Sequence, residues 1–137
     1  MVERMDDANS TMHIGELADK TGLSLRTLRH YDEIGLVSAS GRTEGGFRLY
    51  TQSDYERLIL IRRMKPLGFS LEEMADLLHI IDTLATISSN PDITLEVDSA
   101  TLRAKLAEFI SDAGDRREKL RSQLMMADEF VELLRAQ

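Results

Sequence analysis

The chain has 137 residues, of which 42% are apolar and 30% are charged, and it contains no cysteine and no tryptophan. This length suits one compact domain, or a small domain with an appendage. Without cysteine, the chain forms no disulfide, no thiolate metal site and no iron–sulfur cluster. Its apolar runs are shorter than the roughly 18 residues that span a bilayer. We therefore expect a soluble cytoplasmic protein without a membrane partner.

The net charge of −7 is unevenly distributed along the chain. Residues 13–69 hold nine basic and seven acidic side chains, whereas residues 70–137 hold seven basic and fourteen acidic ones. Such asymmetry indicates two different tasks on one chain. Residues 1–12 are polar, acidic and without periodicity, so we expect a disordered leader there.

Two short helices are predicted after the leader. Apolar residues repeat at helical spacing over residues 14–18, and Gly22 is placed to end that helix in the left-handed conformation. Ser24 is a good N-cap for a second helix that runs to Gly35. This pair fits a helix-turn-helix, and it fits an ordinary helical hairpin equally well.

The next segment favours the helix-turn-helix, because it has the pattern of a β-hairpin. A glycine-rich stretch over residues 41–46 leads into the alternating run Phe47-Arg48-Leu49-Tyr50. A hairpin directly after a helix-turn-helix is the wing of a winged helix. Arg48 and Tyr50 should share one face of the strand, and Phe47 and Leu49 the other. Leu49 is the expected packed residue, and either aromatic, Phe47 or Tyr50, is the alternative core residue.

Two further helices follow the hairpin. Thr51 and Asp54 form a capping-box pattern for the third helix, which is predicted to end near Pro66. Ser70 and Glu73 form the same pattern for a fourth helix that runs to residue 81. We predict a connecting loop over residues 82–97.

Residues 98–137 predict one long helix with a heptad seam that contains a single four-residue stutter. So small a protein cannot cover such a stripe within itself, which favours pairing with a second copy. The alternative is that the stripe packs back on the third and fourth helices. The expected dimer-interface residues are Leu102, Leu106, Phe109, Ala113, Arg117, Leu120, Leu124, Ala127, Val131 and Leu134.

An enzyme is not indicated, because no catalytic constellation is apparent. His13, His30 and His79 stand in separate segments without metal-ligand spacing. The glycine-rich stretch lacks the Lys-Ser/Thr pair of a phosphate-binding loop. We therefore expect no metal and no cofactor. The fold class is mainly α: a winged helix-turn-helix with four helices and a hairpin, followed by a long coiled-coil dimerisation helix.

The basic residues make a better case for DNA binding. Arg26, Arg29 and His30 share one face of the second helix, where arginine can read guanine or grip a phosphate. Arg48 is a candidate for contact with a phosphate or with the minor groove from the wing. Four bases between residues 57 and 65, with no acid among them, supply a third point of contact.

Three motifs carry a resemblance to a known family. They are TLRHY at residues 27–31, GFRLY at 46–50 and GFSLEE at 68–73. In this order and spacing, residues 13–81 resemble the DNA-binding domain of the MerR family of bacterial transcription regulators. The expected DNA-binding residues, by matching position or by basic charge, are Arg26, Arg29, His30, Tyr31, Arg42, Phe47, Arg48, Tyr50 and Arg62.

The resemblance implies a homodimer held by an antiparallel coiled coil of the last helices. It implies recognition helices in successive major grooves of near-palindromic, double-stranded promoter DNA, with RNA polymerase nearby, and a promoter spacer that is bent and untwisted. Two positions depart from the family pattern: an aromatic residue often replaces His30, and a proline often stands near Ala39. Metal-sensing members use cysteines, which this chain lacks. The expected signal is therefore a small molecule at the dimer interface, a partner protein, or nothing.

Two other readings use the same features. A DNA-architectural or excisionase-like factor would carry the winged domain without regulating a promoter, but such factors usually lack the long helix. An interaction adaptor would use the coiled coil as its functional part, and the acidic second half of the chain permits that reading.

Overall fold

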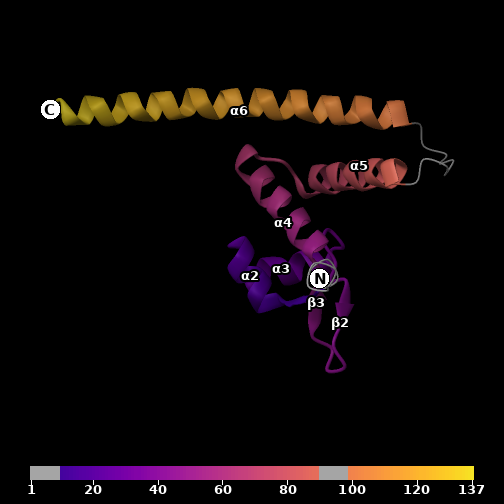
Figure 1. Cartoon of the computed structure of the whole chain (residues 1–137). Coiled ribbons are helices and arrows are strands. Elements are labelled where there is room, and N and C mark those ends of the chain that lie inside the picture. The colour runs from indigo at the N-terminus through magenta and orange to yellow at the C-terminus, as the bar shows by residue number, and fades with distance from the viewer. Residues whose placement is uncertain (1–9, 90–98) are drawn as a thin grey trace, which may run out of the picture. The chain divides into compact units, whose positions relative to one another are not determined.

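The computed structural model of the chain describes residues 10–89 and 99–137 as helices joined to a small sheet (Figure 1). They form two compact units, one up to Ala75 and one from Asp76 onward. Each unit is described by itself. Within the described residues, no helix is long and apolar enough to cross a membrane. The helices and strands are β1 (Met12–His13), α2 (Ile14–Thr21), α3 (Leu25–Glu33), β2 (Gly41–Arg42), β3 (Arg48–Tyr50), α4 (Gln52–Met64), the 3-10 turn η1 (Lys65–Leu67), α5 (Leu71–Ser89) and α6 (Ser99–Arg135).

The predicted N-caps are present at the starts of α3, α4 and α5. Ser24 Oγ accepts a hydrogen bond from the backbone N–H of Thr27 at 3.0 Å, which starts α3. Thr51 and Asp54 form a reciprocal capping box at the start of α4. Ser70 N–H donates to Glu73 at 2.9 Å, and Ser70 Oγ accepts from the N–H of Glu73 at 3.1 Å. The helix starts predicted from local sequence are therefore confirmed.

Gly22 makes the turn between α2 and α3. It has a φ of 75°, and its N–H donates to the carbonyl of Ala18 at 2.8 Å. A side chain in this left-handed conformation is strained by about 1–2 kcal/mol. A Cβ added there would meet the guanidinium of Arg62 at 3.5 Å, an ordinary contact, so the expected cost is in the backbone.

Gly22→Ala is therefore expected to lower the free energy of unfolding by about 1–2 kcal/mol. Gly15→Ala is the matched control, because Gly15 lies inside α2 and an added Cβ has no atom within 4 Å. That change should raise stability by about 0.5–1 kcal/mol. Urea unfolding followed by circular dichroism measures both values. Equal effects of the two changes would contradict the turn's role.

The wing sheet has three strands rather than the two of the predicted hairpin. Its antiparallel order is β1-β3-β2, with Met12 opposite Tyr50 and Gly41 opposite Leu49. Met12 is buried and pairs with β3, so the prediction of a disordered leader is wrong at its last residue. Residues 1–9 of that leader lie outside the described residues. The signal was missed because two residues are too few to show strand alternation.

The core of the first unit lies between the helices and the sheet. Asp54 is the charged group buried there, at 2% exposure. Its carboxylate accepts hydrogen bonds from the N–H of Thr51 at 2.9 Å and from Ser40 Oγ at 2.6 Å, which offset the cost of burial. It thereby ties the start of α4 to the loop before β2. The large apolar side chains of this unit that are fully buried are Leu17, Leu28, Val37, Tyr50, Leu58 and Ile61.

In the second unit, α5 continues well past the predicted end of the fourth helix. It reaches Ser89, so the predicted loop over residues 82–97 is wrong for residues 82–89. Residues 90–97 lie outside the described residues. The hydroxyls of Thr83 and Thr86 donate to the carbonyls of His79 and Asp82, four residues back, at 2.8 and 3.0 Å. These bonds satisfy the threonines inside a helix.

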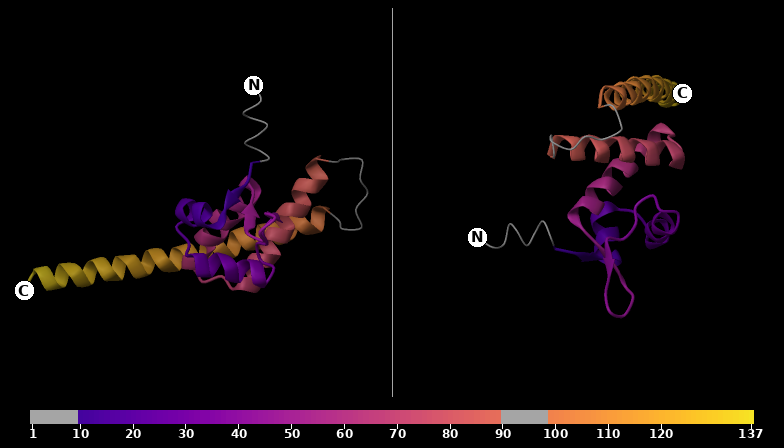
Figure 2. Two further views of the ribbon diagram at one scale, coloured as in Figure 1. Left: turned by 90° about the horizontal axis from the view of Figure 1, so that it is seen from below. Right: turned by 90° about the vertical axis from the view of Figure 1, so that its right-hand side faces the viewer.

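The long helix α6 has 37 residues, about 55 Å at 1.5 Å per residue. Its first part lies beside α5 within the second unit, and its C-terminal half extends beyond α5 as a single helix (Figures 1 and 2). Leu102 is buried inside the protomer at 4% exposure. Its assignment to the dimer interface is wrong, because its own chain covers it. Leu106, Phe109 and Ala113 are half-buried.

The later part of the seam is exposed. Leu120, Leu124, Val131 and Leu134 are 40–61% exposed. At the stutter, the side chain of Arg116 is 27% exposed and pairs with Asp112, whereas Arg117 is 68% exposed. The alternative in which the apolar stripe packs on its own chain therefore holds only for the start of α6. The C-terminal half of the stripe is not covered by the protomer.

Candidate nucleic-acid interface

The recognition helix α3 separates an apolar face from a basic one. Leu28 and Tyr31 are buried at 1% and 3% exposure. Arg26, Arg29 and His30 are exposed. In the described parts of the chain, no hydrogen bond or ion pair engages the guanidinium of Arg26 or Arg29. Both side chains are therefore available to an anionic or hydrogen-bonding partner.

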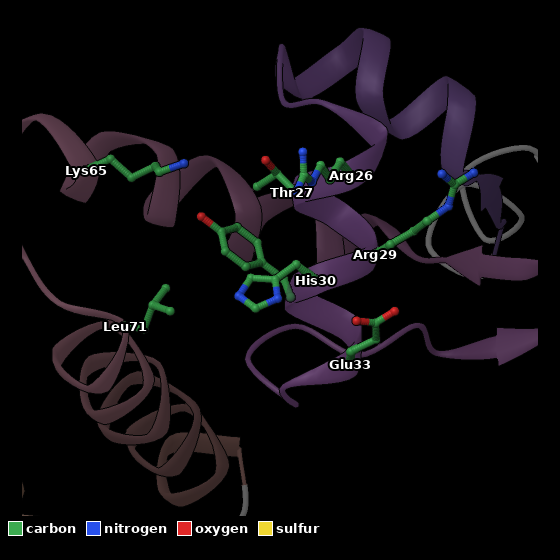
Figure 3. Close-up of a pocket in the computed structure, with 8 residues that line it drawn as sticks. Arg26, Thr27, Arg29, His30, Glu33, Lys65 and Leu71 are labelled. Carbon is green, nitrogen blue, oxygen red and sulfur yellow. The ribbon is translucent and has the colours of Figure 1, made fainter.

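The basic face borders an open depression of about 670 Å³ (Figure 3). Lys65 of η1 and Leu71 of α5 line one side of it, and α3 lines the other. The ammonium of Lys65 lies 5.8 Å from the centre of the Tyr31 ring, within the range of a cation–π contact. The ring of the buried Tyr31 thus stabilises the ammonium group of Lys65 at the surface. Arg26, Thr27, Arg29, His30 and Glu33 complete the lining.

Asp32, on the last turn of α3, connects the recognition helix to the wing. Arg48 Nε donates to its carboxylate at 2.7 Å, and the backbone N–H of Ala39 donates at 2.9 Å. Arg42 Nη2 lies 3.4 Å away. Burial favours a higher pKa for Asp32, but these hydrogen bonds and the charges of both arginines outweigh it and hold the pKa below its usual value. The carboxylate is ionised at neutral pH.

The wing turn presents an exposed aromatic side chain. The backbone N–H of Thr43 donates to the carbonyl of Phe47, and that of Gly46 donates to the carbonyl of Thr43, both at 2.9 Å. The side chain of Arg42 braces the turn by donating to the carbonyl of Gly46 at 2.9 Å. Phe47 is 69% exposed. The loop extends away from the helices of this unit (Figures 1 and 2).

Tyr50 belongs to the core rather than to the DNA-facing surface. Its exposure is 1%, and its hydroxyl is buried without a hydrogen-bond partner among the described residues. Burial raises its pKa. The expectation that Tyr50 contacts DNA is wrong, because neighbouring elements cover its ring. Leu49, the expected packed residue, is only half-buried.

Arg62 lies apart from the residues around α3. Its guanidinium lies 3.5 Å from the position that a Cβ on Gly22 would take, and it lines a second depression of about 560 Å³ with Lys20 and Arg63. Tyr55, Ile59 and Pro66 complete that depression. The structure therefore brings Arg26, Arg29, His30 and Tyr31 together, places Arg42, Phe47 and Arg48 on the wing, and keeps Arg62 beside the turn of the helix-turn-helix.

Two residues of this surface were missed as site residues. Lys65 stood among the predicted bases, but only the fold brings it to α3. Asp32 is sixteen residues from its partner Arg48, so local spacing does not reveal the pair. An available signal was the pair of acids, Asp32 and Glu33, at the end of a helix that carries two arginines. Within the described residues, no group of three or more His, Cys, Asp or Glu side chains could hold a metal ion.

Comparison with known proteins matches two family descriptions to the chain. MerR HTH family regulatory protein matches residues 12–79, and MerR, DNA binding matches residues 55–127. The HTH-type transcriptional regulator YfmP of Bacillus subtilis (strain 168) is 37% identical over 122 residues. That alignment covers 88% of this chain and 80% of YfmP.

The mercuric resistance operon regulatory protein of Bacillus cereus is 48% identical over 69 residues, which are 50% of this chain and 52% of that protein. The match thus spans about half the length of that relative. Among solved structures, HiNmlR, a MerR family regulator lacking the sensor domain and bound to promoter DNA, is similar with a TM-score of 0.58. It is 26% identical, and the alignment covers 90% of this chain and 84% of HiNmlR.

Proposed function

Since the chain belongs to the MerR family and is a DNA-binding transcription regulator, we propose that it acts as a homodimer on a near-palindromic promoter site. Each copy inserts α3 into a major groove, with the two grooves successive along the duplex. The observation that carries the proposal is the exposure of Arg26 and Arg29 on the capped α3, where neither makes an ion pair with a described residue. Arginine in this position reads guanine or grips a phosphate.

The dimer is proposed from the exposed seam in the C-terminal half of α6. Its leucine and valine side chains have little cover in the protomer. Two seams pack together in a coiled coil and remove this apolar surface from water. Pairing also links two α3 helices, so that one protein contacts two half-sites at once. The resemblance to the family implies the same arrangement, with the dimerisation helices antiparallel.

The regulatory step is proposed to be a change of promoter shape. The bound dimer bends and untwists the spacer so that RNA polymerase engages both promoter elements. Deforming a site costs on the order of 1–10 kcal/mol, offset by the additional contacts that the deformed DNA makes with the wings and with α4. HiNmlR, which lacks the sensor domain and is bound to promoter DNA, supports the binding of promoter DNA by a chain of this fold. The chemistry is binding alone, without catalysis.

The proposal is tested by selecting short duplexes from a random-sequence pool and footprinting the enriched sequence in the DNA upstream of the chain's own gene. The expected result is a near-palindrome with half-sites about one helical turn, roughly 10 base pairs, apart. Its position relative to the promoter elements then distinguishes spacer untwisting from simple repression. If no sequence is enriched from the pool, the proposal is wrong. Below, "the selected duplex" means the enriched sequence.

A further inference from the structure

Asp32 holds three segments of the first unit through one carboxylate. It stands on the last turn of α3, and its partners are on β3, on β2 and in the loop before β2. Only 12% of its side chain is exposed. A carboxylate on a helix that approaches DNA is unfavourable for phosphate binding, so its place there calls for a compensating role.

The two wing arginines are held by Asp32 to different degrees. Arg48 donates at 2.7 Å, and its side chain is 21% exposed. Arg42 lies at 3.4 Å, is 52% exposed and also donates to the wing turn. Short, charge-assisted bonds shielded from water persist, whereas long, exposed ion pairs contribute little. The side chain of Arg48 is therefore held in place by Asp32, whereas that of Arg42 leaves Asp32 easily.

We propose that Asp32 is a positioning residue for DNA binding, which fixes the wing against the recognition helix through Arg48 and leaves Arg42 to move to a DNA phosphate. This inference rests on the proposed use of α3 and the wing as the DNA-facing surface. A wing that is already fixed in place loses less conformational freedom on binding, which increases affinity. Arg48 is then a part of this support rather than a phosphate contact.

The first test compares two neighbouring carboxylates. Asp32→Asn removes the charge but keeps an oxygen that can accept from the N–H of Ala39. Glu33→Gln removes the same charge one residue later, from a side chain that is exposed and without an ion pair in the described chain. Asp32→Asn is expected to weaken binding to the selected duplex by roughly tenfold or more, although it removes an acid. Glu33→Gln is expected to raise affinity, because it removes a negative charge from the lining of the depression beside α3.

The second test separates the two arginines by the salt dependence of binding. Arg42→Gln should reduce the slope of log K against log salt by about one, as expected for one lost phosphate contact. Arg48→Gln should weaken binding but leave the slope unchanged. Asp32→Asn combined with Arg48→Gln should bind no more weakly than either single variant, because both remove the same support. Fluorescence anisotropy across a salt series measures all of these quantities.

Two results would overturn the inference. Tighter binding by Asp32→Asn, matching that of Glu33→Gln, would show that Asp32 only masks positive charge. A slope reduced by about one in Arg48→Gln would make Arg48 a phosphate contact. Melting by circular dichroism identifies a variant that fails to fold. If Asp32→Asn does not fold, the salt slopes of Arg42→Gln and Arg48→Gln test the inference. Each salt series is repeated on a random-sequence duplex. If no sequence is enriched from the pool, promoter recognition is contradicted, and the binding of the variants to the random-sequence duplex still tests the role of Asp32.

Discussion

Replacing Leu124 with lysine is expected to convert the protein into a monomer and to lower its affinity for the selected duplex by about 10²- to 10⁴-fold. Leu124 is 61% exposed in the protomer and lies in the seam of α6. In a dimer, the change places one lysine from each copy in an apolar contact. Two buried, unpaired ammonium groups are strongly unfavourable. Loss of pairing then removes the second α3 from the same duplex, so each half-site binds alone.

Met125→Lys is the matched control for this change. Met125 is 58% exposed, nearly the same as Leu124, and is the next residue in the chain. It lies about 100° further around the helix, outside the seam. Sedimentation at micromolar concentration should show a dimer for the unmodified chain and for Met125→Lys, and a monomer for Leu124→Lys. Two dimers with equal DNA affinity would show that this seam is not the interface.

Local sequence predicted the helices because the determining interactions are local. The capping partners at Ser24 and at Thr51 with Asp54 are three residues apart. The turn at Gly22 needs only a residue that tolerates positive φ. These signals are complete within one or two turns of chain, so the rest of the fold changes them little. The same reasoning explains why the long helix was found to within a few residues of its ends.

Burial could not be predicted as well, because it depends on which elements meet. Strand alternation correctly separates Leu49 from Tyr50, but it does not say which face is covered. In the structure, β1 pairs with β3 at Tyr50, which is buried. Leu102 shows the same limit: like Leu124 it falls in the apolar seam, yet of these two only Leu102 is covered within the protomer.

The candidate interface was predictable where it lies on one helix. Arg26 and Arg29 are one turn apart, so their shared face follows from spacing alone. The contacts that hold this face in place were not predictable from the sequence. Lys65 reaches Tyr31 from η1, and Arg48 reaches Asp32 from β3. Such pairs exist only after the chain has folded, and a pattern search over neighbouring residues passes over them.

Replacing both arginines of α3, Arg26→Ala with Arg29→Ala, is expected to remove most of the sequence selectivity of the protein. Each good arginine–guanine pair contributes about 1–3 kcal/mol of discrimination, so the double change should weaken binding to the selected duplex by two or more orders of magnitude. Binding to a random-sequence duplex should fall less, because the phosphate contacts proposed for the wing and α4 are unchanged. The measured quantity is the ratio of the two affinities at one salt concentration.

Lysine replacements at the same positions separate base reading from phosphate binding. Arg26→Lys with Arg29→Lys keeps both charges but removes the planar fork that bonds guanine at two points. If these arginines read bases, the lysine variant should keep the salt slope of the unmodified chain and lose selectivity for the selected duplex. If they only grip phosphates, it should keep both. Because no ion pair of the described chain holds either guanidinium, these changes alter the contacts with DNA without breaking a support within the fold.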